Sequence, residues 1–141
     1  MIEVVNRQRK LQIDTAPWVA FARKVVKAAP AHVAAVTVVF VSDRAMRTLN
    51  REWRGKRGTT DVLSFSSAQS AFEEEAEATL GDIVISVEQA ERQAAEQGSS
   101  LDQEIAQLIL HGVLHLCGYD HETDEGEMSR LEMRLRRRLG I

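Results

Sequence analysis

The stretch "HGVLHLCGYDH", residues 111–121, holds three of the four histidines in the chain and predicts the helix around which the fold is built. His111 and His115 are four residues apart, so on a helix they lie one turn apart on the same face. The longer stretch "LDQEIAQLILHGVLHLC", residues 101–117, is apolar on nearly every side, which is typical of a buried helix. Gly118 ends this helix and lets the chain reverse, so His121 is able to fold back toward the pair.

Three imidazoles brought together in this way predict a metal site. They suit Zn²⁺ and leave its fourth position to water, so we expect one zinc ion per chain, bound by His111, His115 and His121. Cys117 is a rival ligand, but it points away from His115 around the helix and is more typical of a small buried apolar residue. Asp120 is expected to cap the turn or to orient a histidine from outside the ligand set.

The same histidine spacing is found in metallopeptidases, whose general base is a glutamate directly after the first histidine. In this chain Gly112 holds that place. A zinc ion with an open position indicates hydrolysis, but without the base the peptidase route is disfavoured. Cleavage of a phosphodiester gains more from positive charge near the phosphoryl oxygens, which a metal ion and arginine supply.

The segments on either side of this stretch predict an α+β fold. Short apolar or alternating runs indicate four strands, at residues 2–6, 34–41, 61–66 and 80–87. Capping residues, among them Ser42, Ser86 and Ser100, and amphipathic spacing indicate helices from Asp14 or Thr15 to Ala29, over 44–53, from Ser86 to Gly98, over 101–117 and from Asp124 to Leu139. We therefore expect a single domain over residues 1–141, in which helices pack on one mixed sheet of about four strands. The acidic segment 67–79 is expected to be mobile.

Charge is distributed unevenly along the 141 residues, although the net charge is only −3. "REWRGKR" (51–57) and "RLEMRLRRR" (130–138) are basic, whereas "EEEAE" (73–77) and "DHETDEGE" (120–127) are acidic. Local patches of this kind are able to steer a polyanion onto one face. The alternative for each run is an ordinary solvated helix face or loop. One cysteine, no signal peptide and no membrane-spanning apolar run favour the cytoplasm.

The order of the motifs resembles the YbeY family, bacterial endoribonucleases that mature ribosomal RNA. The similarity rests on "LNREWRGKRGTTDVLSF" (49–65), "LGDIVIS" (80–86), "HGVLHLCGYDH" (111–121) and the acidic helix start that follows. It covers residues 33–135, which is most of the chain. The resemblance implies a four-stranded mixed sheet with surrounding helices and a metalloprotease-like zinc-binding helix.

The resemblance also implies site residues and a biological role. His111, His115 and His121 match the zinc ligands of the family, and Arg54 in "WRG" matches its functional arginine, so we expect Arg54 and His111 to be catalytic. The implied activity is zinc-dependent, single-strand-specific endonuclease cleavage in 16S rRNA maturation and ribosome quality control. The implied partners are single-stranded RNA, an rRNA precursor, and the ribosome or its small subunit, and no membrane is expected.

Two departures from the family pattern concern the basic loop. Trp53 stands where the family usually has tyrosine, which keeps an aromatic ring beside Arg54 that is able to stack on a base. "GKRGTTDVLSF" replaces the more usual "GKDKPTDVLSF", so the loop is more basic and lacks a proline. Two alternatives to the nuclease remain at this point: a non-catalytic RNA-binding ribosome-assembly protein with a structural zinc, and a metallopeptidase.

Overall fold

The computed structural model describes residues 1–66 and 79–141, leaving out the side chains of Ala34, Thr79 and Leu80, and most of the segment expected to be mobile lies outside this part. Its strands form one four-stranded sheet in the order β1-β2-β4-β3. β1, β2 and β4 are parallel, and β3 runs antiparallel to β4 at one edge. The mixed four-stranded sheet is thus confirmed. The strands are β1 (Ile2–Asn6), β2 (Val33–Val41), β3 (Val62–Ser66) and β4 (Thr79–Ser86).

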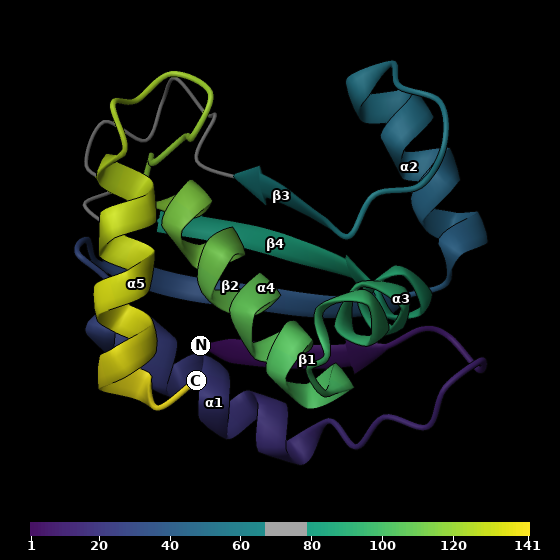
Figure 1. Cartoon of the computed structure of the whole chain (residues 1–141), viewed down its shortest axis with the longest axis horizontal. Helices are drawn as coiled ribbons and strands as arrows, with labels where there is room; N and C mark the ends of the chain where they lie inside the picture. The colour runs from purple at the N-terminus through teal and green to yellow at the C-terminus, as the bar shows by residue number, and fades with distance from the viewer. Residues whose placement is uncertain (67–78) are drawn as a thin grey trace.

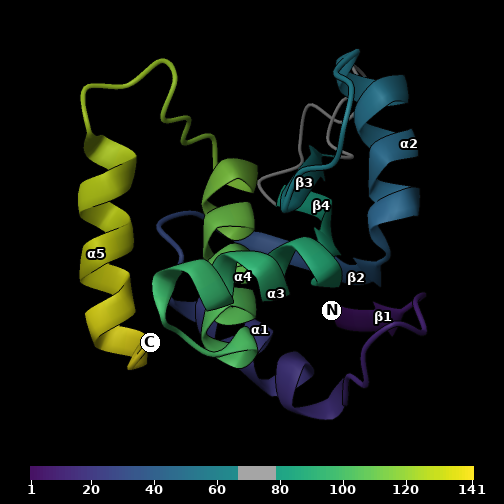
Figure 2. The same ribbon diagram turned by 45° about the vertical axis from the view of Figure 1, so that its right-hand side comes forward.

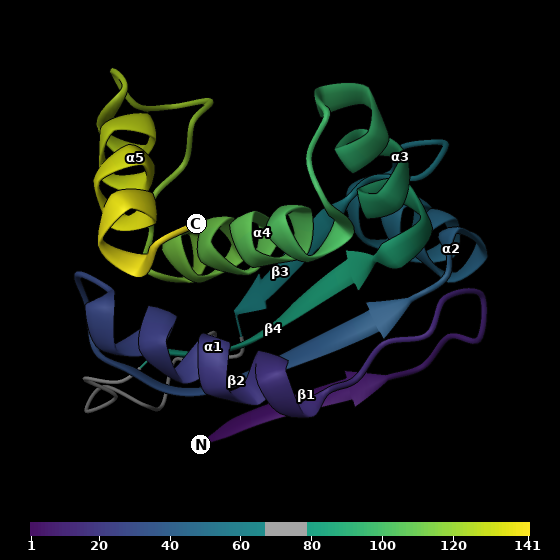
Figure 3. The ribbon, with the colours of Figure 1, turned by 60° about the horizontal axis from the view of Figure 1, so that its bottom comes forward.

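Helices cover both faces of the sheet (Figure 1). They are α1 (Ala16–Ala28), α2 (Asp43–Arg54), α3 (Val87–Gln97), α4 (Leu101–Leu116) and α5 (Glu127–Leu139). Figure 2 shows α4 and α2 on opposite sides of β3 and β4. α3 follows β4 and contacts both α2 and α4. α5 stands across one end of α4, which it contacts (Figure 3).

Two apolar clusters hold these layers together because alternate strand residues point to opposite faces. The larger cluster joins α1, α4 and α5 to one face, with Phe40 and Ile83 fully buried at its centre beside Ile109 of α4. The smaller cluster lies on the other face of the sheet, where Met46 of α2 packs with Val84 of β4. α4 is buried along most of its length, as its all-round apolar sequence predicts.

The helix caps follow the sequence closely. Each of the serines expected to cap accepts a hydrogen bond from the backbone N–H three residues on, at Ser42, Ser86 and Ser100. Among the boundaries that differ, α5 begins at Glu127 and not at Asp124, and α2 continues through Arg54, which the sequence places in the loop. Gly55, at φ 64°, ends the helix in the left-handed region. Arg54 is therefore fixed by helical backbone and not by a loop.

Candidate active site

α4 brings the first two predicted site residues together. His115 Nε2 lies 2.9 Å from His111 Nε2, and the ring centroids are 4.5 Å apart. Burial, followed by the neighbouring His111, lowers the pKa of His115 below its ordinary value. A lowered pKa favours the neutral imidazole, whose unprotonated nitrogen is free to bind a metal ion.

His121 returns to the helix end through a tight turn. Asp120 builds this turn, because its side chain accepts from the N–H of Glu122 and its backbone carbonyl from the N–H of Asp124. The His121 ring stacks on His111 with centroids 5.0 Å apart, whereas its centroid is 6.4 Å from that of His115. The structure thus pairs His111 with each of the other two histidines but does not gather all three around one point.

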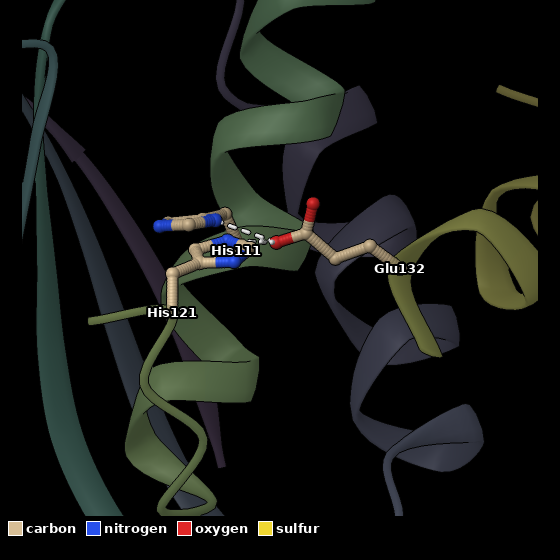
Figure 4. A group of neighbouring side chains, drawn as sticks. All are labelled: His111, His121 and Glu132. Carbon is tan, nitrogen blue, oxygen red and sulfur yellow. Dashed lines mark hydrogen bonds and ion pairs between the residues drawn. The ribbon is translucent and has the colours of Figure 1, made fainter. Parts of the chain in front are cut away.

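Glu132 of α5 completes the cluster and has no counterpart in the sequence prediction. Its Oε1 lies 2.6 Å from His111 Nδ1 and 3.5 Å from His121 Nε2 (Figure 4). Within the described part of the chain, this trio forms the one group of three candidate ligands whose ligand atoms all lie within 4.8 Å of one another. Burial acts to raise the pKa of Glu132, but the hydrogen bond and charge of His111 outweigh it and lower that pKa, which favours the carboxylate.

The sequence held a weak signal for Glu132. It is the single acidic residue in the basic run 130–138, which suggested a solvated face. It also lies four residues after Met128 and three before Leu135, both of which are buried. That spacing places Glu132 beside the inward-facing stripe of α5, where a carboxylate requires a polar partner.

A cavity of about 480 Å³ joins the histidines to Arg54. Its wall includes Arg54 at the end of α2, the β3 residues around Ser64, and all three predicted histidine ligands. Arg54 is exposed, and its guanidinium makes no hydrogen bond or ion pair with the residues that the structure describes. The Ser64 hydroxyl donates to the carbonyl of Gly112 at 3.3 Å, which ties the cavity wall to the histidine helix.

Gly112 explains why the position of the peptidase base carries no side chain. A Cβ there would lie 2.7 Å from Cγ2 of Ile83 on β4, closer than real Cβ contacts. α4 therefore packs on the sheet through a residue that has room only for hydrogen. A glutamate at this position would have to enter the core and not the cavity.

Buried polar residues of α2 hold the loop that follows Arg54. Asn50 Nδ2 donates to the carbonyl of Gly58 at 3.1 Å, and the Thr59 hydroxyl donates to Asp43 Oδ1 at 3.2 Å. Asp43 Oδ1 also accepts from the Ser86 hydroxyl at 2.7 Å, and Arg92 lies 2.6 Å from Oδ2. Burial acts to raise the pKa of Asp43, but these partners outweigh it and lower the pKa below 3.8.

Comparison with known proteins gives one consistent result. The family model described as Endoribonuclease YbeY matches residues 3–140. Endoribonuclease YbeY of Desulforamulus reducens is 50% identical over 113 residues, which cover 77% of this chain and 74% of that protein. The protein of the same name from Solibacter usitatus is 45% identical over 121 residues, covering 86% of this chain and 76% of its own length.

A solved structure supports the same assignment. The solution structure of TM1509 from Thermotoga maritima superimposes with a TM-score of 0.65 at 27% identity, covering 99% of this chain and 89% of that one. The structural match extends over both the mixed sheet and the histidine helix, since almost the whole chain is included. Given the match of the family model over nearly its full length, this chain belongs to the endoribonuclease YbeY family.

Proposed function

We propose that this chain is a zinc-dependent endoribonuclease that cleaves single-stranded RNA, with ribosomal RNA precursors as its substrates. The family match over residues 3–140 carries the proposal. Within it, 16S rRNA maturation and ribosome quality control are the processes served, and the ribosome or its small subunit is the partner. No helix among the described residues is both long and apolar enough to cross a membrane.

The residues at the candidate site fit a zinc ion. Imidazole is among the donors that zinc prefers, and the His111 ring lies against the rings of both His115 and His121. We propose His111, His115 and His121 as the ligands and one ion per chain. Glu132 contacts the far nitrogen of His111, because Nε2 of that ring faces His115 while Nδ1 faces the carboxylate. In this position a carboxylate does not bind the metal ion itself but holds the His111 ring in one orientation and one tautomer.

The remaining chemistry follows from the residues around the cavity. Zinc, when bound, supplies a Lewis acid that activates water and polarises a phosphoryl oxygen. Arg54 lines the same cavity with a guanidinium that has no partner among the described residues and is able to give two parallel hydrogen bonds to phosphate oxygens. Glu132 keeps the proton of His111 on Nδ1, so Nε2 stays free as a donor atom. Catalysis then depends on positioning and charge and not on a peptidase-type base.

Two observations favour this function over the alternatives. The histidines open onto a cavity of about 480 Å³, whereas structural zinc sites are closed by four protein ligands. A peptidase requires a base where Gly112 packs against Ile83, and that position has no room for one.

The test compares substrates at known metal content. Purified protein is analysed for zinc and assayed on labelled single-stranded RNA, double-stranded RNA and casein, with and without a chelator. We expect one zinc per chain and chelator-sensitive cleavage of single-stranded RNA alone. The His111→Ala variant should lose zinc and cleavage together. Cleavage of casein, or RNA binding without cleavage at full zinc content, would overturn the proposal.

A further inference from the structure

Trp53 is unusually exposed for a side chain of its size. Its exposed fraction is 67%, although it follows Met46 and Asn50 on the helix face that packs on the sheet. The other tryptophan, Trp18, is half-buried and packs against Phe21 and Phe40. The C-terminal end of α2, which carries Trp53, extends past β3 (Figure 2). An indole left in water there contributes little to folding.

One aromatic contact fixes the ring. Trp53 packs against Phe65 with centroids 5.6 Å apart and planes at 69°. Phe65 belongs to β3, the strand at one edge of the sheet, and its side chain is on the face opposite Ser64, which contacts α4. The indole therefore stands beside the β3 edge of the sheet, restrained by Phe65 while most of its surface stays open.

Four cationic residues lie within four positions of Trp53 in the sequence. Arg51, Arg54, Lys56 and Arg57 are all exposed. In residues 1–66 and 79–141, none of these four cations makes a side-chain hydrogen bond or an ion pair. An exposed aromatic ring among unpaired cations is the combination by which proteins hold single-stranded nucleic acid, with bases on the ring and phosphates on the cations.

We propose that Trp53 is a stacking platform for one unpaired nucleobase of the RNA substrate, next to the phosphate that enters the cavity at Arg54. The proposal rests on the proposed function and names how the substrate is held. Arg54 follows Trp53 directly and lines the histidine cavity, so a strand whose base lies on the indole continues toward the histidines. Bases paired in a duplex do not offer their faces, so this platform selects single strands.

The test measures binding separately from cleavage. Affinity for an oligouridylate of about eight nucleotides is measured for wild type, Trp53→Leu and Trp53→Phe. We expect Trp53→Leu to bind about 5- to 150-fold more weakly, the range of base–aromatic stacking, and Trp53→Phe to recover much of the loss. Met133, with an exposed fraction of 55% on α5, supplies the control, and Met133→Ala should bind like wild type.

An abasic scan identifies the stacked base. Removing the base that stacks on Trp53 should weaken binding to the wild-type protein. The same removal should not change binding to Trp53→Leu, because that variant has already lost the contact between base and indole. In the Trp18→Phe variant Trp53 is the single remaining tryptophan. Binding of RNA should therefore quench the tryptophan fluorescence of this variant. Equal affinity of wild type and Trp53→Leu, or equal abasic losses at every position, would overturn the platform.

Cleavage assays on the same samples keep the two proposals apart. If wild type cleaves RNA but Trp53→Leu binds and cleaves equally well, the platform fails and the endoribonuclease stands. If wild type binds RNA through Trp53 without cleaving it, the platform stands and the catalytic proposal fails. Melting of each variant is recorded as well, and an exposed position predicts little change.

Discussion

At the scale of single residues, Glu132 offers the sharpest test of the metal site. Its Oε1 lies 2.6 Å from Nδ1 of His111, so its charge orients the ring that we propose as a zinc ligand. Glu132→Gln keeps the shape but loses the charge, and we expect zinc affinity to fall about 10- to 100-fold. Competition with a coloured chelator measures this directly. Glu96→Gln, an exposed change on α3, is the control, and equal zinc affinity in both variants would contradict the role of Glu132.

Arg54 is the residue proposed to hold the scissile phosphate. Arg54→Ala should keep its zinc and its melting temperature, because the side chain is exposed and unpaired among the described residues. Cleavage should fall by about two orders of magnitude or more, the scale of one preorganised donor. Arg54→Lys should recover little, since lysine lacks the planar fork. Arg47→Ala, also exposed on α2, should cleave like wild type. Near-normal cleavage by Arg54→Ala would remove Arg54 from the mechanism.

At the scale of elements, the contact of α4 with β4 depends on Gly112. Alanine there gains helix propensity of about 1 kcal/mol but forces its Cβ to within 2.7 Å of Ile83. We expect Gly112→Ala to lose about 1–3 kcal/mol of the free energy of unfolding through overpacking. Denaturant unfolding measures the loss. In the double variant with Ile83→Ala the two losses should not add, and additive losses would show that the clash is absent.

A second element-scale prediction concerns the polar cluster that joins α2 and α3 to the basic loop. The folded-state pKa of Asp43 lies below 3.8, so its stabilisation is complete above that pH and is lost as pH falls through the folded-state pKa. Asp43→Asn should therefore cost about 1–3 kcal/mol near neutral pH and much less at a pH below the folded-state pKa of Asp43. Urea unfolding at both pH values checks this. A cost independent of pH would mean that the carboxylate charge is not involved.

At the scale of the whole molecule, the two basic regions lie far apart. α2 and its loop flank the cavity, whereas Arg137 and Arg138 occupy the last turn of α5, at the opposite end of that helix from the turn bearing His121 (Figure 1). There they complement the helix dipole. RNA affinity should fall steeply with salt. Removing the charges of Lys56 and Arg57 should reduce the logarithmic salt slope by about 1.4, while Arg137→Ala with Arg138→Ala should leave it unchanged. The reverse result would place RNA on α5.

Much of this protein could be read from local sequence. Periodicity identified the strands and helices, and serine caps placed three helix starts, because these signals depend on neighbours within a few residues. The spacing of His111 and His115 predicts that they lie on one helix face, and the structure places them side by side, because residues four apart on a helix are neighbours. The histidine pattern and the ordered motifs also pointed to the family that the comparisons show.

The tertiary structure decided what no local signal encodes. Glu132 reaches His111 only because α5 packs across α4, and the basic run around it suggested a solvent-facing helix. The reason why Gly112 is glycine lies on another element, at Ile83 of β4. Arg54 shares a cavity with the histidines because α2 and α4 flank the same edge of the sheet. Contacts between residues distant in sequence depend on how whole elements pack, and that packing is fixed by the complete core and not by any one segment.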